Sequence, residues 1–313
     1  MKVVIVGAGA MGSLFGGKLF KITDVQLFTR NQNHVRKINQ SGLLIESSGD
    51  RSNIYYVRAF DDVEKAEEFF DVAILFTKSY DTKQVLYNVK KLLRPKGIVV
   101  TFQNGIGNKE ILKEVFDEEQ IIIGTTAQAA YIREPGVIYH AGIGTTYMEI
   151  NEKNGSILKE LGRMLNDAGL ETILTNDIEP VIWNKLIINS GINAITAIFK
   201  ITNGELISNP KCKLLVEKVV EEAKNIAIKL GINIKKDIKD EVFSVCERTF
   251  RNKSSMLQDI LKGSQTEISY INGAIVRCGV KLGVSVPYNT CLTEMVKILE
   301  STYREDSLIH REF

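Results

Sequence analysis

The sequence predicts an α/β fold, in which an N-terminal doubly wound parallel sheet is followed by a C-terminal all-α domain. Short β-branched strands alternate with helical stretches in the first half, and a glycine-rich turn directly follows the first strand. Beyond about residue 176 only helical periodicity continues. We therefore expect two domains, residues 1–176 and 177–313, and a length of 313 residues also favours two.

The first half repeats a strand–helix rhythm that is typical of a parallel sheet with helices on its faces. Apolar, β-branched runs predict strands at Lys2–Val6, Val25–Phe28, Val72–Phe76, Ile98–Thr101 and Ile121–Ile123. Helices are predicted between several of them, at Met11–Lys21, Lys83–Leu93 and Lys109–Phe116. Two more strands, Gly144–Ile150 and Glu171–Leu174, flank a helix at Gly155–Ala168 and should complete this domain.

The second half has apolar residues at a spacing near 3.6 and no convincing strand. The predicted helices are Val181–Lys200, Cys212–Leu230, Lys235–Asn252, Ser254–Leu261, Thr266–Leu282 and Tyr288–Tyr303. No low-complexity linker separates the two halves, so we expect them to meet at a cleft rather than to swing on a tether.

Composition excludes several classes of protein. Hydrophobic residues make up 44% and charged residues 25% of the chain, and the net charge of +2 favours neither nucleic acid nor an anionic membrane as a partner. The four cysteines form no Cys-x-x-Cys pair and the three histidines are scattered, so we expect no metal. A strand that starts at Lys2 leaves no room for a signal peptide, and we expect a cytoplasmic protein.

The turn after the first strand matches the G-x-G-x-x-G pattern of dinucleotide-binding sites. Its residues, all expected to contact the cofactor, are Gly7, Ala8, Gly9, Ala10, Met11 and Gly12. Gly7 permits the tight turn, Gly9 lets the backbone approach a pyrophosphate, and Gly12 lets the helix pack close to the strand. The N-terminus of that helix then offers N–H groups to phosphate. A glycine-rich turn without a ligand is the alternative.

The end of the second strand indicates which dinucleotide is bound. An NAD site would place Asp or Glu there for the ribose 2′-hydroxyl, whereas this chain has Arg30. A guanidinium is a planar, permanently charged fork that suits a 2′-phosphate, so NADP(H) is predicted. Arg30 could instead be an ordinary solvated surface residue. Lys78 and Asn104 follow two other strand ends and could reach the cofactor or the substrate, or be loop residues.

The predicted helix Val181–Lys200 is apolar nearly all round, yet Lys185, Asn189 and Asn193 form one polar stripe at i, i+4 and i+8. A buried lysine is unfavourable unless it is paired or used. An ammonium group aimed at a carbonyl oxygen could stabilise the charge that develops during ketone reduction and supply the proton. The alternative is a structural network in which Lys185 pairs with an acid.

At this point the residues match a known family. The chain resembles ketopantoate reductase (2-dehydropantoate 2-reductase) over almost its whole length. Besides the glycine turn, the matching segments are Gln103–Gly107, Trp183–Asn189, Asn193–Ala197, Asn203–Leu206, Ser254–Asp259 and Thr266–Gly273, the last two being the most specific. One small departure is Ala194, where the family often has proline.

The resemblance implies a Rossmann-type domain followed by a helical domain similar to that of 6-phosphogluconate dehydrogenase. It also implies reduction of 2-dehydropantoate to (R)-pantoate with NADPH, in pantothenate and coenzyme A biosynthesis. It assigns catalysis to Lys185 and Glu267, with Glu267 also beside the nicotinamide ribose. Implied cofactor contacts are Arg30, Lys78, Asn104 and Ala130. Implied substrate contacts are Lys185, Asn189, Asn193, Asn203, Asn252 and Ser255.

Glu267 has a competing structural interpretation, because Ser264 to Glu267 reads as a capping box at the start of a helix. The residues alone favour the cap, and the resemblance reverses that preference. Two other functions also stay open: a related 2-keto-acid or opine-type dehydrogenase, and a catalytically silent NADPH-binding regulator. Retention of Lys185, Glu267 and the substrate asparagines favours the reductase. The expected partner is a small keto acid, and a homodimer stays open.

Overall fold

The computed structural model describes residues 1–48, 51–66 and 68–309. The chain forms two compact units. The first comprises Met1–Gln103 and Asn108–Ile178, and the second comprises Glu179–Phe313 together with the short segment Asn104–Gly107.

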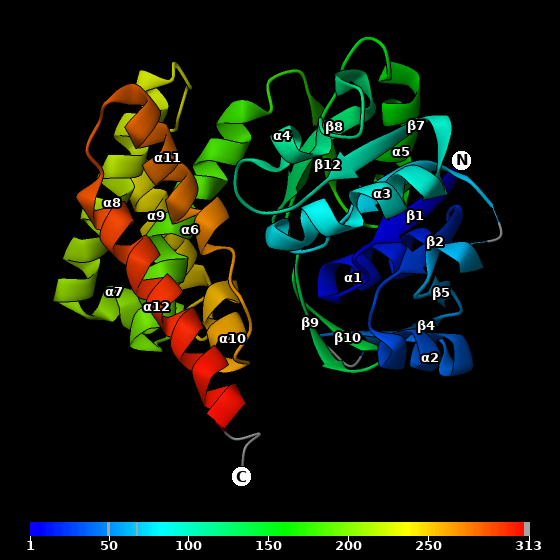
Figure 1. Ribbon diagram of the computed structural model, residues 1–313, viewed down its shortest axis with the longest axis horizontal. Helices are drawn as coiled ribbons and strands as arrows, with labels where there is room; N and C mark the ends of the chain where they lie inside the picture. The colour runs from blue at the N-terminus through cyan, green and yellow to red at the C-terminus, as the bar shows by residue number, and fades with distance from the viewer. Residues whose placement is uncertain (49–50, 67, 310–313) are drawn as a thin grey trace. The chain divides into compact units, whose positions relative to one another are not determined.

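An eight-stranded sheet forms the centre of the first unit, in the order β12-β11-β8-β7-β6-β1-β2-β5 (Figure 1). Its strands are β1 (Lys2–Val6), β2 (Asp24–Phe28), β5 (Arg58–Phe60), β6 (Phe70–Leu75), β7 (Leu93–Thr101), β8 (Ile121–Thr126), β11 (Thr146–Glu149) and β12 (Thr172–Thr175). All neighbours pair parallel except β8 and β11, which pair antiparallel. The mostly parallel α/β architecture is thus confirmed. The antiparallel pair departs from it because no crossover helix joins β8 to β11.

A second sheet, which the sequence analysis did not predict, has the order β4-β3-β10-β9. Its strands are β3 (Leu43–Ser47), β4 (Arg51–Tyr55), β9 (Ala129–Glu134) and β10 (Val137–Gly142). These strands are hard to recognise because β9 is exposed along nearly its whole length and shows no apolar alternation. Most of the apolar side chains that this second sheet contributes to the core of the unit come from β3 and β10.

Helix α1 (Ala10–Leu19) lies between the two sheets, and its own side chains Leu14, Phe15 and Leu19 are fully buried there. A Cβ at Gly16 would lie 2.2 Å from the Leu27 side chain of the large sheet. A Cβ at Gly17 would lie 2.7 Å from the Ile45 side chain of the small sheet. Both glycines therefore allow the helix to approach sheets on opposite sides, which holds the glycine turn before α1 in a fixed place.

The remaining helices of this unit frame the large sheet. They are α2 (Gln32–Ser41), α3 (Thr82–Leu92), α4 (Asn108–Leu112) and α5 (Gly155–Asp167), with short 3-10 turns at Val63–Lys65, Ser79–Asp81 and Glu118–Gln120. Val85, Leu86 and Leu112 join a second core on the sheet face opposite α1. Helix α4 ends earlier than the predicted Lys109–Phe116, because Glu114 and Val115 turn to hydrogen bonds with residues three positions back.

The second unit is helical in the part of the chain that is described. It consists of α6 (Glu179–Phe199), α7 (Asn203–Ser208), α8 (Pro210–Lys229), α9 (Ile238–Arg248), α10 (Ser255–Leu261), the 3-10 turn η4 (Ile268–Tyr270), α11 (Asn272–Leu282) and α12 (Pro287–Ile309). Helix α6 contributes buried Trp183, Ile187 and Ile195 to a core shared with the helices around it. Within the described ranges, each helix is either too short or too polar to cross a bilayer.

The predicted helix Thr266–Leu282 was wrong in its first turns. The 3-10 turn η4 begins only at Ile268, and Ile271, with φ −104° and ψ −92°, separates it from α11. The break places Glu267 on an irregular segment, outside any helix.

Candidate active site

The glycine turn has the geometry that a dinucleotide loop requires. Gly7 has φ +89°, and a Cβ there would lie 2.4 Å from the Thr77 backbone nitrogen, so only glycine fits. The amides of Gly7 and Ala8 both donate to the Phe28 carbonyl, at 2.9 and 3.1 Å. The loop is therefore fixed to the end of β2 and pressed against the segment that follows β6.

The other two glycines of the loop have different surroundings. A Cβ at Gly12 would lie 2.4 Å from the Gly7 carbonyl, so Gly12 is needed for packing within the loop. A Cβ at Gly9 would meet no atom closer than 4.0 Å, so the space beside the Gly9 backbone is open. Gly9 immediately precedes α1, whose first N–H groups have no partners within the helix. An open approach beside N–H donors fits the pyrophosphate of a dinucleotide.

Arg30 lies two residues beyond β2 and is largely exposed. Its guanidinium forms an ion pair with Asp81, at 2.9 Å between Nη2 and Oδ1, and donates to Gln84 Oε1 at 2.9 Å. Both partners belong to the segment from η2 into α3, in the same unit. The Arg30 side chain is thus held in one orientation by Asp81 and Gln84, and the Asp81 partner is a carboxylate.

Two further predicted cofactor contacts also lie in the first unit. Lys78 is half-buried and lies three residues after the end of β6, directly before the turn Ser79–Asp81. The buried Gln103 amide holds this loop by donating to the Thr77 carbonyl and to Thr82 Oγ1, both at 2.8 Å. Ala130 lies near the start of β9, paired with His140 of β10.

Lys185 lies on the first half of α6, where most of its neighbours are apolar. Burial lowers the pKa of Lys185 from 10.5 to about 8, and the nearby negative charge of Glu267 partly opposes this shift. At neutral pH the amine is therefore mostly protonated but gives up its proton far more readily than a solvated lysine does. That combination suits a proton donor.

Glu267 is 5% exposed and accepts a hydrogen bond from Asn104 Nδ2 at 3.2 Å. The second unit thus brings together Lys185, Glu267 and Asn104, the last from a segment that is remote in the sequence. The capping-box interpretation of Glu267 is wrong, because no helix begins at Ser264 and the Glu267 carboxylate points to Asn104 instead.

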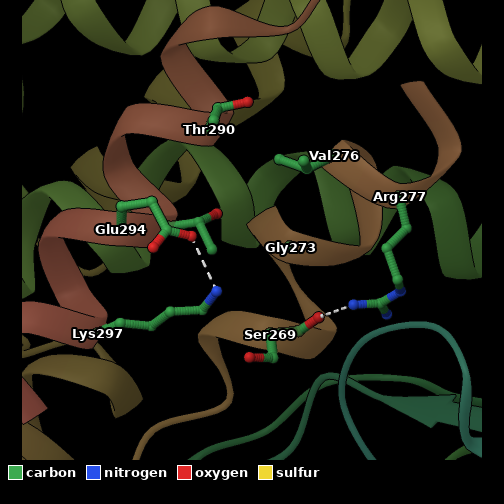
Figure 2. A pocket seen from close by; sticks show the side chains of 8 residues that line it. Ser269, Gly273, Val276, Arg277, Thr290, Glu294 and Lys297 are labelled. Atoms are coloured by element: carbon green, nitrogen blue, oxygen red, sulfur yellow. Dashed lines mark hydrogen bonds and ion pairs between the residues drawn. The ribbon is translucent and has the colours of Figure 1, made fainter. Parts of the chain in front are cut away.

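Two contacts hold the segments that bear Asn104 and Glu267. The Ile106 amide donates to the Tyr270 carbonyl at 3.0 Å, and Gly105, with φ +84°, leaves no room for a Cβ beside that same carbonyl. The Arg277 guanidinium donates to the carbonyl of Ser269, the residue before Tyr270, at 2.7 Å (Figure 2). The pocket in Figure 2 is also lined by Glu294 and Lys297, which form an ion pair at 2.8 Å between Lys297 Nζ and Glu294 Oε1.

The other polar residues of α6 continue along the face that begins with Lys185. Asn189 is half-buried and Asn193 is buried. Thr196, one turn farther, bonds through Oγ1 to Ser254 Oγ at 2.7 Å. Ser254 is the N-cap of α10, so this bond fixes the start of α10 beside α6 and places Ser255 as its first residue.

Asn203 and Asn252 come together through their backbones. The Asn203 amide donates to the Asn252 carbonyl at 3.0 Å, and the Asn203 side chain donates to Thr249 Oγ1 at 2.8 Å. Asn203 is buried, and its Oδ1 has no hydrogen-bond partner among the described residues, while the side chains of Asn252 and Ser255 are exposed.

The residues that position these groups were not identified as such from the sequence. Thr196, Ser254 and Gln103 were recognised only as members of the matching segments Asn193–Ala197, Ser254–Asp259 and Gln103–Gly107, with no role assigned to their side chains. Their common feature is burial of a polar side chain, which becomes visible only when the fold is known.

A dinucleotide loop on a mostly parallel sheet, joined in one chain to a helical unit that contains a lysine of lowered pKa, is characteristic of nicotinamide-dependent oxidoreductases. Comparison with known proteins narrows this class. Residues 3–153 match the family model described as ketopantoate reductase PanE/ApbA, and residues 177–300 match that of its C-terminal region. The chain belongs to the ketopantoate reductase family.

Relatives of similar length support this assignment. The chain is 37% identical to the 2-dehydropantoate 2-reductase of Pyrococcus horikoshii over 96% of this chain and 98% of the relative. It is 34% identical to that of Archaeoglobus fulgidus, with the same coverage.

Solved structures are similar to the chain as well. A ketopantoate reductase of this family from Ralstonia eutropha is 29% identical, with a TM-score of 0.90 over 97% of this chain and 100% of that one. D-mandelate dehydrogenase in complex with NADH and anilino(oxo)acetate is 30% identical, with a TM-score of 0.89 and the same coverage.

Proposed function

We propose that this oxidoreductase reduces 2-dehydropantoate to (R)-pantoate with NADPH, a step of pantothenate and coenzyme A biosynthesis. Residues 1–176 would bind the cofactor, and residues 177–313 would hold the substrate and the catalytic groups. The observation that carries the proposal is the lysine of lowered pKa beside Glu267, in a chain whose relatives are full-length 2-dehydropantoate 2-reductases.

The glycine loop and Lys78 would bind the cofactor, which when bound supplies a hydride to C2 of the keto acid. As the C2–H bond forms, the carbonyl π electrons move onto oxygen and negative charge develops there. Burial shields the Lys185 ammonium from water, and there its positive charge would stabilise that oxygen more strongly than it would in water. The Lys185 ammonium then transfers its proton to the oxygen, which gives the hydroxyl group of pantoate and leaves a neutral amine that is reprotonated from solvent.

Glu267 has two supporting roles in this proposal. Its negative charge opposes the loss of the Lys185 proton, so the ammonium persists at neutral pH. Its bond to Asn104 holds the carboxylate in place. The carboxylate would then lie beside the nicotinamide ribose, as the family resemblance implies. Asn189, Asn193, Asn203, Asn252 and Ser255 would bind the carboxylate and hydroxyl groups of the substrate, since amide and hydroxyl groups can do so without adding a second charge.

NADPH is the preferred cofactor in this proposal because β2 is followed by Arg30, and the end of this strand has no Asp or Glu that could bind the ribose 2′-hydroxyl. The ion pair with Asp81 keeps the guanidinium oriented in the absence of ligand. A 2′-phosphate would have to compete with that carboxylate, so we expect the preference for NADPH to be moderate rather than absolute.

A second candidate function is the NADH-dependent reduction of another 2-keto acid. The likeness to D-mandelate dehydrogenase bound to NADH favours it, because that protein is as similar in sequence and fold as the reductase from Ralstonia eutropha. The Asp81 carboxylate beside Arg30 also offers an acceptor of the kind that a ribose 2′-hydroxyl would use.

One experiment separates the two candidates. Purified protein is incubated with NADPH or NADH and either 2-dehydropantoate or an aromatic 2-keto acid, and oxidation of the cofactor is followed at 340 nm. The proposal predicts the highest kcat/KM for NADPH with 2-dehydropantoate. A higher kcat/KM for the aromatic acid would support the second candidate, and cofactor binding without turnover of either acid would support a silent regulator.

A further inference from the structure

His34 is a buried histidine that the proposed reaction does not use. It is 1% exposed and lies in the first turn of α2, four residues after Arg30. A polar ring in such a place needs hydrogen-bond partners for both nitrogens, and His34 has both.

The partners of His34 determine the protonation of its ring. The Gly136 amide donates to Nδ1 at 3.0 Å, and a backbone N–H can only donate, so Nδ1 has no proton. The neutral ring therefore has its proton on Nε2 and donates it to Ser13 Oγ at 3.0 Å. The Ser13 hydroxyl in turn donates to the Ala8 carbonyl at 3.2 Å.

This chain of hydrogen bonds ends on the glycine loop. The Ala8 carbonyl and the Gly9 amide belong to one peptide plane, and the Gly9 amide donates to the Gly7 carbonyl at 2.7 Å. A bond that holds the Ala8 carbonyl therefore also sets how the Gly9 backbone is presented at the start of α1. Burial lowers the pKa of His34, so the neutral ring required by these bonds predominates at neutral pH.

Three segments that carry or adjoin predicted cofactor contacts converge on this one imidazole. The glycine loop is reached through Ser13. The start of α2, just after Arg30, is held by the His34 amide, which donates to Asn31 Oδ1 at 3.1 Å. Gly136, with φ +83°, forms the turn between β9, the strand of Ala130, and β10.

We propose that His34 is a positioning residue for dinucleotide binding: its uncharged ring, protonated on Nε2, holds the glycine loop through Ser13 while it anchors the β9–β10 turn through Gly136. The proposal rests on the proposed use of this loop for NADPH. It predicts that the two nitrogens of His34 have separable effects, one on cofactor affinity and the other on stability.

The two conservative variants of His34 each retain one nitrogen's function. The side-chain oxygen of asparagine can take the place of Nδ1 and accept from Gly136, so His34→Asn keeps the turn anchored and loses the donor to Ser13. The amide nitrogen of glutamine can take the place of Nε2, so His34→Gln keeps the donor to Ser13 and leaves the Gly136 amide without its acceptor. Ser13→Ala removes the hydroxyl that donates to the Ala8 carbonyl and leaves His34 in place.

The experiment measures the Kd for NADPH by titration, and kcat and both KM values, for the wild type and these variants. We expect His34→Asn and Ser13→Ala to weaken NADPH binding about tenfold, the effect typical of losing one buried hydrogen bond and leaving its partner unsatisfied. His34→Gln should stay within about threefold of the wild type and melt at a lower temperature. Both kcat at saturating NADPH and the KM for the keto acid should change little.

Asn39→Ala is the matched control. Asn39 lies on the same helix and ties it to β5 by two hydrogen bonds with the Ala59 backbone, at 2.8 and 2.9 Å, without reaching the loop. We expect it to lower the melting temperature and leave the Kd unchanged. The double variant of Ser13→Ala with His34→Asn should bind NADPH as Ser13→Ala alone does, because both changes break the same chain of bonds.

Two results would overturn the inference while leaving the proposed function intact. One is wild-type affinity in both His34→Asn and Ser13→Ala. The other is an equal loss of affinity in His34→Asn and His34→Gln, which would mean that only the volume of the ring matters. A wild-type protein that binds no NADPH would contradict the proposed function itself, and this inference with it.

Discussion

At the scale of single residues, Lys185 is subject to two opposing influences. Burial removes water from its ammonium group, whereas the charge of Glu267 stabilises that group. The result is a pKa of about 8, close to neutral pH. Proton transfer is efficient when the pKa of the donor lies near the working pH, so this position suits a general acid.

The pH dependence of the reaction follows from this pKa. Reduction needs the protonated amine, so kcat should be nearly constant from pH 6 to 7 and should fall about tenfold per unit once the pH rises well above 8. Oxidation of pantoate with NADP⁺ needs the neutral amine and should rise over the same range. A reductive kcat that stays level up to pH 10 would contradict the role of Lys185 as the acid.

The lowered pKa of Lys185 should also make the stability of the folded protein depend on pH. The pKa of Lys185 is about 8 in the folded protein and near 10.5 when solvated, so the unfolded state binds more protons between these pH values. Stability should therefore rise as the pH increases through this window, and the full penalty for burying the charge applies below pH 8. Lys185→Met removes that charge, and we expect on the order of 1–3 kcal/mol more stability at pH 7 with activity lost, measured by urea unfolding.

Arg30 and Asp81 should set the cofactor preference together. Arg30→Ala should weaken NADPH binding about 10- to 100-fold, as expected for loss of a charge-assisted bond, and leave NADH within about threefold. Asp81→Asn removes the competing carboxylate and should strengthen NADPH binding a few-fold. Equal Kd values for NADPH in the wild type and in Arg30→Ala would show that Arg30 does not bind the 2′-phosphate.

At the scale of elements, the glycines of the dinucleotide loop differ in what they contribute. A Cβ at Gly9 would meet open space, and its φ of −77° suits any residue, so Gly9→Ala should fold as well as the wild type. It should nevertheless bind NADPH more weakly, since the added methyl group occupies the approach to the backbone. Gly12→Ala should instead lose about 1–3 kcal/mol of stability, because its Cβ would overlap the Gly7 carbonyl. Circular-dichroism melting curves, read beside the Kd, separate the two effects.

Periodicity predicted those elements that are buried on both faces or that have one strong apolar stripe. The strands β1 and β6, the part of β7 from Ile98 to Thr101, and the helix α6 fall into this group. The second sheet was missed because β9 is mostly exposed and its pairing is set by partners far along the chain. The break at Ile271 was missed because the apolar spacing continues through it.

At the scale of the whole molecule, the segment Asn104–Gly107 is the notable exception to a simple division of the sequence. It follows β7 in the chain, yet it groups with the helical unit, where Asn104 meets Glu267 across 163 positions. No local pattern could predict that pair. The function of Glu267 was suggested by resemblance alone, and the structure adds that its carboxylate accepts a hydrogen bond from Asn104 and acts on the charge of Lys185.

Gly105 tests the importance of this segment. Gly105→Ala would place a Cβ 2.2 Å from the Tyr270 carbonyl, so it should displace Asn104 from Glu267 and lower kcat about tenfold or more. Gly107→Ala is the control, because Gly107 also has positive φ but a Cβ there would meet nothing closer than 3.7 Å. Equal kcat values in the two variants would mean that strain, rather than the lost contact, explains any effect.

The central claim is that Lys185 donates the proton in reduction of 2-dehydropantoate. The most direct test compares the wild type with Lys185→Ala at pH 7, by following NADPH oxidation with 2-dehydropantoate and measuring the Kd for NADPH separately. We expect a fall in kcat/KM of about 10²- to 10³-fold with the Kd for NADPH unchanged, as for loss of a positioned electrostatic donor. A Lys185→Ala enzyme with nearly normal kcat/KM would contradict the claim.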